Sequence, residues 1–172
     1  MSQLSKKIIK WQRKFGRNDL PWQINTNPYK VWISEIMLQQ TQVKTVIPYF
    51  EKFMNRYPNI ESLADSTEDE VLSYWSGLGY YSRGRNVLKS AKIIKKEFNS
   101  SMPSDLGSLE SLPGIGKSTA GAILSLGFKK RAAILDGNAK RVLVRYFKVE
   151  EVIDSTRTVK KLWQIAEEQL PK

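Results

Sequence analysis

Hydrophobic positions recur at helical spacing along nearly the whole chain. Near the N-terminus, steps of four, three and four residues separate Leu4, Ile8, Trp11 and Phe15. This is the spacing of one face of an α-helix, and Gly16 follows as a stop signal. The alternation typical of strands is nearly absent, and residues 131–135 (RAAIL) are the best short candidate. The pattern predicts an all-α chain of about eight to ten helices with short connections.

The remaining helices are expected from the same periodicity and from their start and stop signals. Residues 67–70 (TEDE) predict a capping box that opens one helix, and Gly77 and Gly79 interrupt it. Residues 17–28 are expected to form a loop. The other predicted helices span residues 28–39, 43–57, 82–98, 104–112, 117–128, 136–147 and 155–170.

Residues 112–124 (LPGIGKSTAGAIL) match the helix–hairpin–helix pattern. Leu112 precedes a Pro-Gly turn, and Gly114 and Gly116 allow the backbone to turn tightly so that its amides point outward at a helix start. Phosphate accepts such hydrogen bonds without any base being read, and Lys117 adds positive charge. The motif therefore indicates binding to the DNA backbone, with an ordinary tight αα-turn as the alternative.

Glu35 is a carboxylate within an apolar helical run, VWISEIMLQQTQ. Its neighbours one turn away are Val31, Trp32, Leu38 and Gln39, and three of these four are hydrophobic. A carboxylate on or beside a buried face holds its proton to higher pH and is a candidate general acid. The alternative is a surface glutamate at the edge of the apolar stripe.

Asp136 follows an apolar run and precedes Gly-Asn and a basic helix, in the segment ILDGNAKRV. It can cap that helix, and a carboxylate at a helix start stays ionised. The alternative is that capping is its only role. An acid at Glu35 and an anion at Asp136 are what cleavage of a glycosidic bond requires. A base in DNA can be reached only after it leaves the stack.

Two segments are candidates for filling the gap that a displaced nucleotide leaves. Gln39 and Gln40 lie at a helix end, and Tyr80 follows flexible glycines. The basic residues after Tyr80 are candidates for phosphate contacts: Arg83, Arg85 and Lys89. The alternative is that Tyr80 and Tyr81 are core aromatics and that the basic residues form a solvated face.

The charge balance favours a polyanionic partner. The 172 residues include 28 Lys and Arg against 17 Asp and Glu, a formal net charge of +11, which is typical of nucleic-acid binding but can also follow from a lysine-rich composition. Cysteine and histidine are absent, which excludes disulfides, thiolate or imidazole metal sites and histidine bases within this chain. No membrane span or signal peptide is found, so a cytoplasmic location is expected.

Several segments together resemble the adenine DNA glycosylases of the MutY type, which share the helix–hairpin–helix-GPD superfamily with endonuclease III. In order, these segments are LPWQ, PYKVWISEIMLQQTQVKTVIPYF, GLGYYSRGRN, LPGIGKSTAGAILSL and ILDGNAKRVL. The resemblance implies double-stranded DNA as partner, removal of adenine mispaired with 8-oxoguanine or guanine, and a monomeric chain. It also implies the fold, a six-helix barrel plus part of a second helical subdomain.

The resemblance assigns roles to individual residues. Glu35 matches the general acid that protonates adenine at N7, and Asp136 matches the carboxylate that stabilises the sugar cation. Asn138 matches a residue near the catalytic water, and Trp22 lies in the stretch that lines the adenine pocket. Positions that contact the mispair from within the stack correspond to Gln39, Gln40 and Tyr80.

Ser118 stands where lyase relatives of the endonuclease III type carry a lysine. A hydroxyl cannot form the Schiff base that cuts the strand, so a monofunctional glycosylase is expected. Two alternatives remain: a non-catalytic helix–hairpin–helix DNA-binding fragment, and an endonuclease III-like glycosylase/lyase.

The resemblance also predicts the domain organisation. Residues 1–20 would pack with the second helical subdomain, residues 21–133 would form the barrel with the hairpin at 108–124, and residues 134–172 would form the incomplete second subdomain. Family members hold a [4Fe–4S] cluster with four cysteines, expected here beyond residue 172, and then carry a separate domain for 8-oxoguanine. The chain is accordingly expected to be a fragment or a short relative, with no cofactor bound by its own residues.

Overall fold

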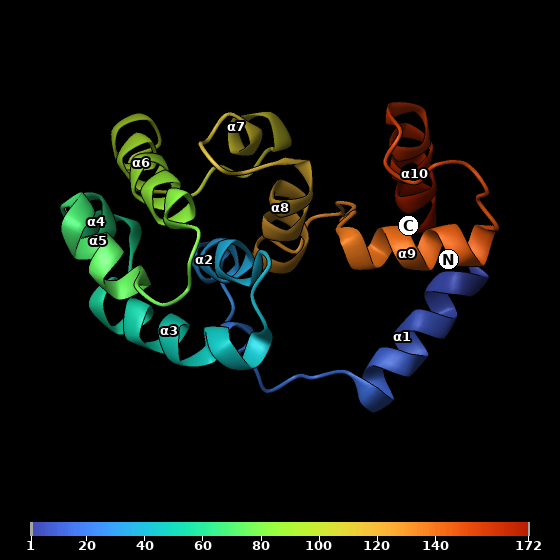
Figure 1. Ribbon diagram of the computed structural model, residues 1–172, viewed down its shortest axis with the longest axis horizontal. Helices are drawn as coiled ribbons and strands as arrows, with labels where there is room; N and C mark the ends of the chain where they lie inside the picture. The colour runs from blue at the N-terminus through green and yellow to red at the C-terminus, as the bar shows by residue number, and fades with distance from the viewer. Residues whose placement is uncertain (1, 172) are drawn as a thin grey trace. The chain divides into compact units, whose positions relative to one another are not determined.

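The computed structural model describes residues 2–171, and every regular element in that range is helical (Figure 1). It contains ten α-helices, one 3₁₀ turn and one π-helical turn, and no strand occurs between residues 2 and 171. The expectation of an all-α chain is therefore confirmed. The chain divides into a central unit, Asp19–Lys129, and an end unit formed by the two chain ends, up to Asn18 and from Lys130 onward.

The helices follow one another with short connections. The central unit contains η1 (Pro21–Gln23, 3₁₀), α2 (Pro28–Leu38), α3 (Val43–Arg56), α4 (Ile60–Ala64), α5 (Glu68–Trp75), α6 (Tyr81–Glu97), α7 (Leu106–Glu110), α8 (Lys117–Ala122) and η2 (Ile123–Gly127, π). The end unit contains α1 (Gln3–Phe15), α9 (Gly137–Phe147) and α10 (Thr156–Gln169). None of the helices in the described range is both long and apolar enough to cross a bilayer.

Helix starts follow the capping residues that the sequence supplies. The predicted capping box at Thr67 and Glu70 is present: the Thr67 amide and hydroxyl donate to the Glu70 carboxylate at 2.8 and 3.0 Å. These hydrogen bonds lower the pKa of Glu70, so the cap holds at neutral pH. Asn27 caps α2 by accepting from the Lys30 amide at 2.9 Å, with Pro28 in the first turn.

Residues 131–135 form no strand, in keeping with the expected all-α fold, and two of their side chains are buried in the end unit. Two local expectations were wrong. The predicted loop 17–28 contains the turn η1. The helix predicted over 117–128 changes at Ile123 into a π turn. A Cβ at Gly127 would lie only 2.7 Å from the Cα of Pro28, so this turn packs tightly against the start of α2.

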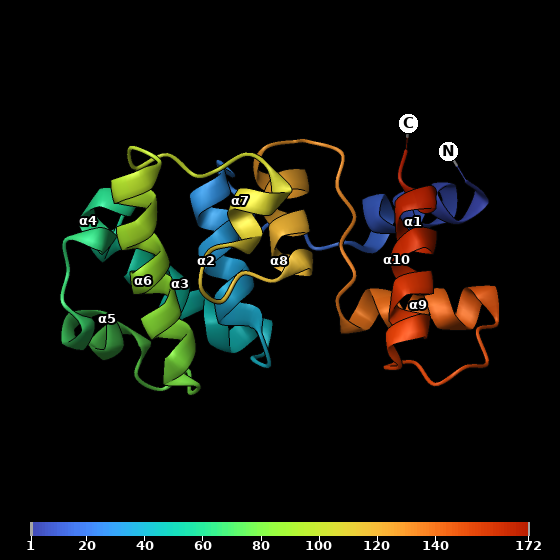
Figure 2. The same cartoon turned by 90° about the horizontal axis from the view of Figure 1, so that it is seen from above.

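Helix α2 is the buried centre of the central unit. Three of its side chains, Trp32, Ile33 and Met37, have no exposed surface. Helices α3, α6 and α8 and the turn η2 all contact α2, and Figures 1 and 2 show these helices arranged around it. Burying one such side chain contributes about 1.5–3 kcal/mol to folding, so α2 holds this unit together.

An aromatic cluster fixes α2 against α3 and α5. The Phe53 ring lies 4.9 Å from that of Tyr57 and 5.9 Å, edge-on, from that of Trp75. The Tyr29 hydroxyl donates to the Tyr57 carbonyl at 2.9 Å and joins the start of α2 to the end of α3. Burial raises the pKa of Tyr29 above its usual value, so this hydroxyl remains a donor.

The end unit has its own small core. Its buried residues are Leu4, Ala133, Leu135, Leu143, Val149, Leu162 and Ala166. The Ser5 hydroxyl donates to the Gln169 carbonyl and joins the two ends of the chain. Of the apolar stripe predicted for α1, only Leu4 is buried, whereas Ile8, Trp11 and Phe15 are exposed.

A matched pair of leucines tests the packing of the central unit. Leu63 is fully buried, and Leu63→Ala is expected to lower the free energy of unfolding by about 2–5 kcal/mol because it leaves a cavity. Leu126 is 45% exposed, so Leu126→Ala is expected to cost much less. Urea unfolding followed by tryptophan fluorescence measures both, and equal losses would contradict this view of the core.

Candidate functional site

Glu35 lies at the boundary between the buried and the exposed sides of α2. Val31 and Trp32, one turn before it, are 3% and 0% exposed, whereas Gln39, one turn after it, is exposed. Glu35 itself is half-buried. Its carboxylate therefore has apolar neighbours on one side and the surface end of the helix on the other.

The two glutamines predicted to enter the DNA stack lie at the exposed end of α2. Gln39 caps the helix, and Gln40 follows with a left-handed backbone, φ 57°. Both side chains are exposed. A residue other than glycine in this conformation costs of order 1 kcal/mol or more, so the surrounding structure must hold Gln40 in place.

Tyr80 has a similar position at the start of α6. Its backbone is also left-handed, φ 50°, and its side chain is 60% exposed. Tyr81 is 44% exposed, so the alternative that these two tyrosines are core aromatics is wrong. Gly79, with φ 70°, gives the chain the turn that presents Tyr80 at the surface.

Arg83 joins these two turns from inside the protein. Its side chain is 9% exposed, and its guanidinium donates to six oxygens: the carbonyls of Ile36, Met37, Gln39, Leu78 and Gly79 and the hydroxyl of Thr41. Burial lowers the pKa of this guanidinium, but an arginine remains charged. The prediction that Arg83 contacts phosphate is therefore wrong, because the side chain is buried and its two terminal nitrogens donate to oxygens within the protein.

The predicted hairpin divides into buried anchors and exposed glycines. Leu112 and Ile115 are 2% and 4% exposed, whereas Gly114 and Gly116 are exposed. Gly114 has φ 80°, and Gly116 caps α8 without any side-chain hydrogen bond. Leu112 can therefore contribute only its backbone to a ligand, while its side chain fixes the turn.

Lys117 and Ser118 form the start of α8, next to Gly116. Both side chains are half-buried. The arrangement is suited to binding a phosphate group at the exposed side of the turn.

One face of α6 contacts the hairpin as well as the turns that carry Gln40 and Tyr80. Arg83, Asn86 and Ser90 lie three and four residues apart, which places them on the same side of the helix. Ser90 is fully buried and donates to the Pro113 carbonyl at 2.9 Å, and a Cβ on Gly114 would lie 3.0 Å from the Cβ of Asn86. We call the exposed residues so assembled the edge surface: Gln39, Gln40, Tyr80, Gly114 and Gly116.

Asn86 and Ser90 belong to no motif that the sequence alone singles out. Their helical spacing with Arg83 was visible, but a polar stripe at this spacing is equally typical of a solvated face. Only the packing of α6 shows that it faces inward.

In the end unit, Asp136 caps α9. Its carboxylate accepts from the Ala139 amide at 2.7 Å and from the Asn138 side-chain amide at 3.4 Å. The expected capping role is therefore confirmed. The Asn138 oxygen accepts from Arg141 at 2.5 Å, and both Asp136 and Asn138 are exposed. The carboxylate thus keeps one side open to a ligand.

Trp22 lies in η1 and is 8% exposed. Its ring lies 5.4 Å, edge-on, from that of Phe50 on α3. The residue is thus part of the packing of the central unit. Its role in lining a base pocket stays a prediction.

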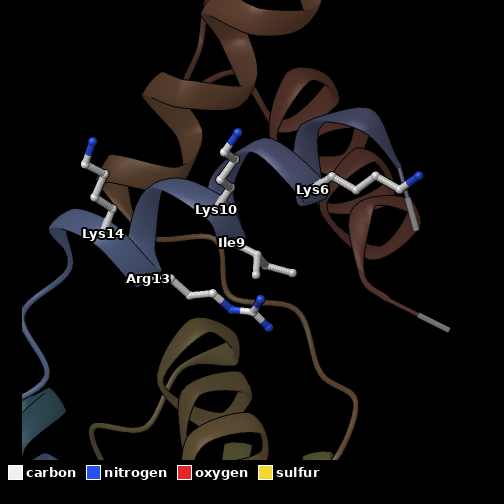
Figure 3. Close-up of a pocket in the computed structure, with 5 residues that line it drawn as sticks. All are labelled: Lys6, Ile9, Lys10, Arg13 and Lys14. Atoms are coloured by element: carbon white, nitrogen blue, oxygen red, sulfur yellow. The ribbon is translucent and has the colours of Figure 1, made fainter.

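Helix α1 carries a basic face (Figure 3). Lys6, Ile9, Lys10, Arg13 and Lys14 line a shallow hollow there. Figure 3 shows Lys10 and Lys14 extending from one side of α1 and Ile9 and Arg13 from the other. No ion pair is found for Lys6, Lys10 or Arg13 within residues 2–171, so these cations are available to an anionic partner.

The residues present do not fit an iron–sulfur cluster. Such a cluster needs thiolates, and the chain has no cysteine. Among residues 2–171, no group of three His, Cys, Asp or Glu side chains could hold a metal ion.

Three proteins of similar sequence are all DNA glycosylases. The adenine DNA glycosylase of Buchnera aphidicola subsp. Baizongia pistaciae is 57% identical over 164 residues, covering 95% of this chain and 46% of that protein. The human adenine DNA glycosylase is 40% identical over 170 residues, covering 94% and 31%. The thymine/uracil-DNA glycosylase of Pyrobaculum aerophilum is 33% identical, covering 96% and 72%. The chain thus spans about half the length of the Buchnera relative.

Solved structures agree on the fold. A thermostable thymine-DNA glycosylase matches with a TM-score of 0.87 at 28% identity, covering 98% of this chain and 77% of that one. A non-covalent endonuclease III–DNA complex matches with a TM-score of 0.75 at 19% identity, covering 96% and 80%, which supports the fold alone. The family model of the HhH-GPD superfamily base excision DNA repair proteins matches residues 33–168. The chain belongs to the HhH-GPD superfamily.

Proposed function

We propose that the chain is the catalytic part of an adenine DNA glycosylase of base excision repair. Its reaction is hydrolysis of the N-glycosidic bond of adenine paired with 8-oxoguanine or guanine. The 57% identity to an adenine DNA glycosylase over 95% of the chain carries this proposal, because the aligned length includes almost every candidate residue. The half-buried position of Glu35 and the capping position of Asp136 suit the two roles that the reaction needs.

Glu35 acts as the general acid. It gives its proton to N7 of adenine while the C1′–N9 bond breaks, and the bonding electrons leave with the base. The deoxyribose is then cationic, and the carboxylate of Asp136 stabilises it. Water adds to C1′ beside Asn138 and loses a proton, which returns Glu35 to its acid form and completes the hydrolysis.

The edge surface holds the DNA open while this happens. Extruding a base costs a few kcal/mol, and side chains that enter the stack offset that cost. Gln39, Gln40 and Tyr80 supply amide edges and an aromatic ring at the surface. The hairpin binds a phosphate of the backbone, and the cations of α1 add to an attraction that the net charge of +11 already favours.

Ser118 makes the enzyme monofunctional, because its hydroxyl cannot form the imine of a lyase. The proposed partner is duplex DNA with an A:8-oxoguanine or A:G mispair, bound by a monomer in the cytoplasm. A second candidate function is non-catalytic DNA binding. It is favoured by the formal net charge of +11, which binding to the DNA backbone alone would also explain.

Glu35→Gln tests the proposed acid. Removing a general acid costs about 10²–10⁴ in rate, so adenine release from an A:8-oxoguanine duplex should fall by at least 10² under single-turnover conditions. Affinity for the duplex should stay within about threefold, because the amide keeps the size of the carboxyl group. Glu51→Gln, an exposed change on α3, is the matched control.

Each result of this assay separates the candidates. Undiminished release by Glu35→Gln would remove the mechanism. Binding without release by either the unaltered chain or the variant would favour the non-catalytic fragment. A covalent DNA complex trapped by borohydride would favour the endonuclease III-like lyase.

The two hairpin glycines separate a folding effect from a binding effect. Gly114→Ala should lower the free energy of unfolding by about 1–3 kcal/mol, because φ is 80° and the new Cβ meets Asn86 at 3.0 Å. Gly116→Ala meets nothing within 4 Å and should fold normally. Its methyl group would nevertheless obstruct a phosphate at the start of α8, so DNA affinity should fall several-fold.

Thermal unfolding and duplex binding at two salt concentrations measure these effects. Full DNA affinity in Gly116→Ala would contradict phosphate binding at this turn. Equal stability of the two variants would contradict the strain assigned to Gly114.

A further inference from the structure

Two exposed residues of the edge surface have strained backbones. Gln40 and Tyr80 have φ values of 57° and 50°, a region that side chains rarely adopt. They follow different helical elements and are forty positions apart in the sequence. Both turns nevertheless converge on one buried group, the Arg83 guanidinium.

The contacts of Arg83 fall next to both strained residues. Its Nη1 donates to the carbonyl of Gln39, and its Nη2 donates to the carbonyl of Gly79 at 3.3 Å. These carbonyls belong to the peptide groups that directly precede Gln40 and Tyr80. The Tyr80 ring also lies over the guanidinium, with 5.3 Å between the Arg83 Cζ and the ring centroid.

The same guanidinium reaches the helix that carries Glu35. Nη1 donates to the carbonyls of Ile36 and Met37 at 2.9 and 3.1 Å, in the last turn of α2. Only a planar group with donors on separate nitrogens can donate hydrogen bonds to α2 on one side and to the 78–79 turn on the other. A lysine keeps the charge but concentrates its donors on a single nitrogen.

We propose that Arg83 is a positioning residue that holds Gln40 and Tyr80 in their left-handed conformations and fixes their separation for insertion beside a mispaired base. It contacts no DNA itself. The part of this inference that concerns mispairs rests on the function proposed above, whereas the part that concerns backbone order does not.

Arg83→Lys tests the inference, and Arg56→Lys is the matched control. Arg56 is an exposed arginine of the same unit, paired with Glu70 at 3.5 Å. Amide hydrogen exchange of the free protein should accelerate about tenfold or more in peptides covering residues 39–42 and 78–82 of Arg83→Lys, but not in α3. The control should exchange like the unaltered chain.

The DNA arm compares affinity for an A:8-oxoguanine duplex with affinity for the same duplex fully paired. Arg83→Lys should reduce this preference about tenfold. Gln40 and Tyr80 would no longer be held at a fixed separation, while the hairpin would still bind the DNA backbone. A general loss of folding would instead lower both affinities together. If Arg83→Lys melts below the assay temperature, Thr41→Val removes one acceptor of the same guanidinium and should give a smaller change in the same peptides.

Unchanged exchange in residues 39–42 and 78–82 of Arg83→Lys would overturn the positioning role, whatever the DNA arm shows. Accelerated exchange with an unchanged preference would overturn its connection to mispair binding. An unaltered chain that shows no preference at all would count against the proposed function, while the exchange result would still decide the role of Arg83.

Discussion

The carbonyl groups at the end of a buried helix need hydrogen-bond donors. Helix α2 ends at the edge surface, where the side chains of Gln39 and Gln40 must remain exposed. Its last turn cannot be capped by water alone, because the helix is the centre of the central unit. Arg83 supplies those donors from α6 and leaves the side chains of Gln39 and Gln40 exposed. A buried cation that serves backbone carbonyls in this way is costly to desolvate, and six acceptors offset that cost. The edge surface depends on this arrangement.

Helix α6 thereby acts as a common support for three segments that are distant in sequence. Arg83 holds the end of α2 and the turn before Tyr80, while Asn86 and Ser90 contact the hairpin at Gly114 and Pro113. Each support is a specific contact. Arg83 donates to backbone carbonyls, Asn86 lies close to Gly114, and the buried Ser90 hydroxyl donates to Pro113. The residues proposed to contact DNA therefore occupy the surface of a packed scaffold and not a set of independent loops.

Much of the fold could be predicted from the sequence because its signals are local. The helical spacing of hydrophobic residues predicted α1 and α2, and the capping residues Thr67 and Glu70 predicted the start of α5. Helix α4 was missed because its five residues are too short for a period to be recognised. The π turn after α8 was missed because the close approach of Gly127 to Pro28 joins residues nearly a hundred positions apart.

The candidate site shows the same division between local and distant causes. The boundary position of Glu35 and the capping role of Asp136 followed from residues within one turn of each. Arg83 was misjudged because an arginine in the segment YYSRGRN resembles its exposed neighbour Arg85, and only the tertiary packing shows that it is buried. Leu112 was assigned to the DNA contact with its glycines, whereas its side chain fills the core.

The proposed mechanism requires Glu35 and Asp136 to act on a single extruded adenosine. A crystal structure of the chain with an A:8-oxoguanine duplex, in which the adenosine carries a 2′-fluorine that prevents cleavage, would show whether they do. We expect Glu35 within hydrogen-bond reach of adenine N7, Asp136 against C1′ of the same sugar, and Gln40 and Tyr80 within the stack. An extruded adenosine that contacts one carboxylate while the other lies away from the nucleotide would contradict it.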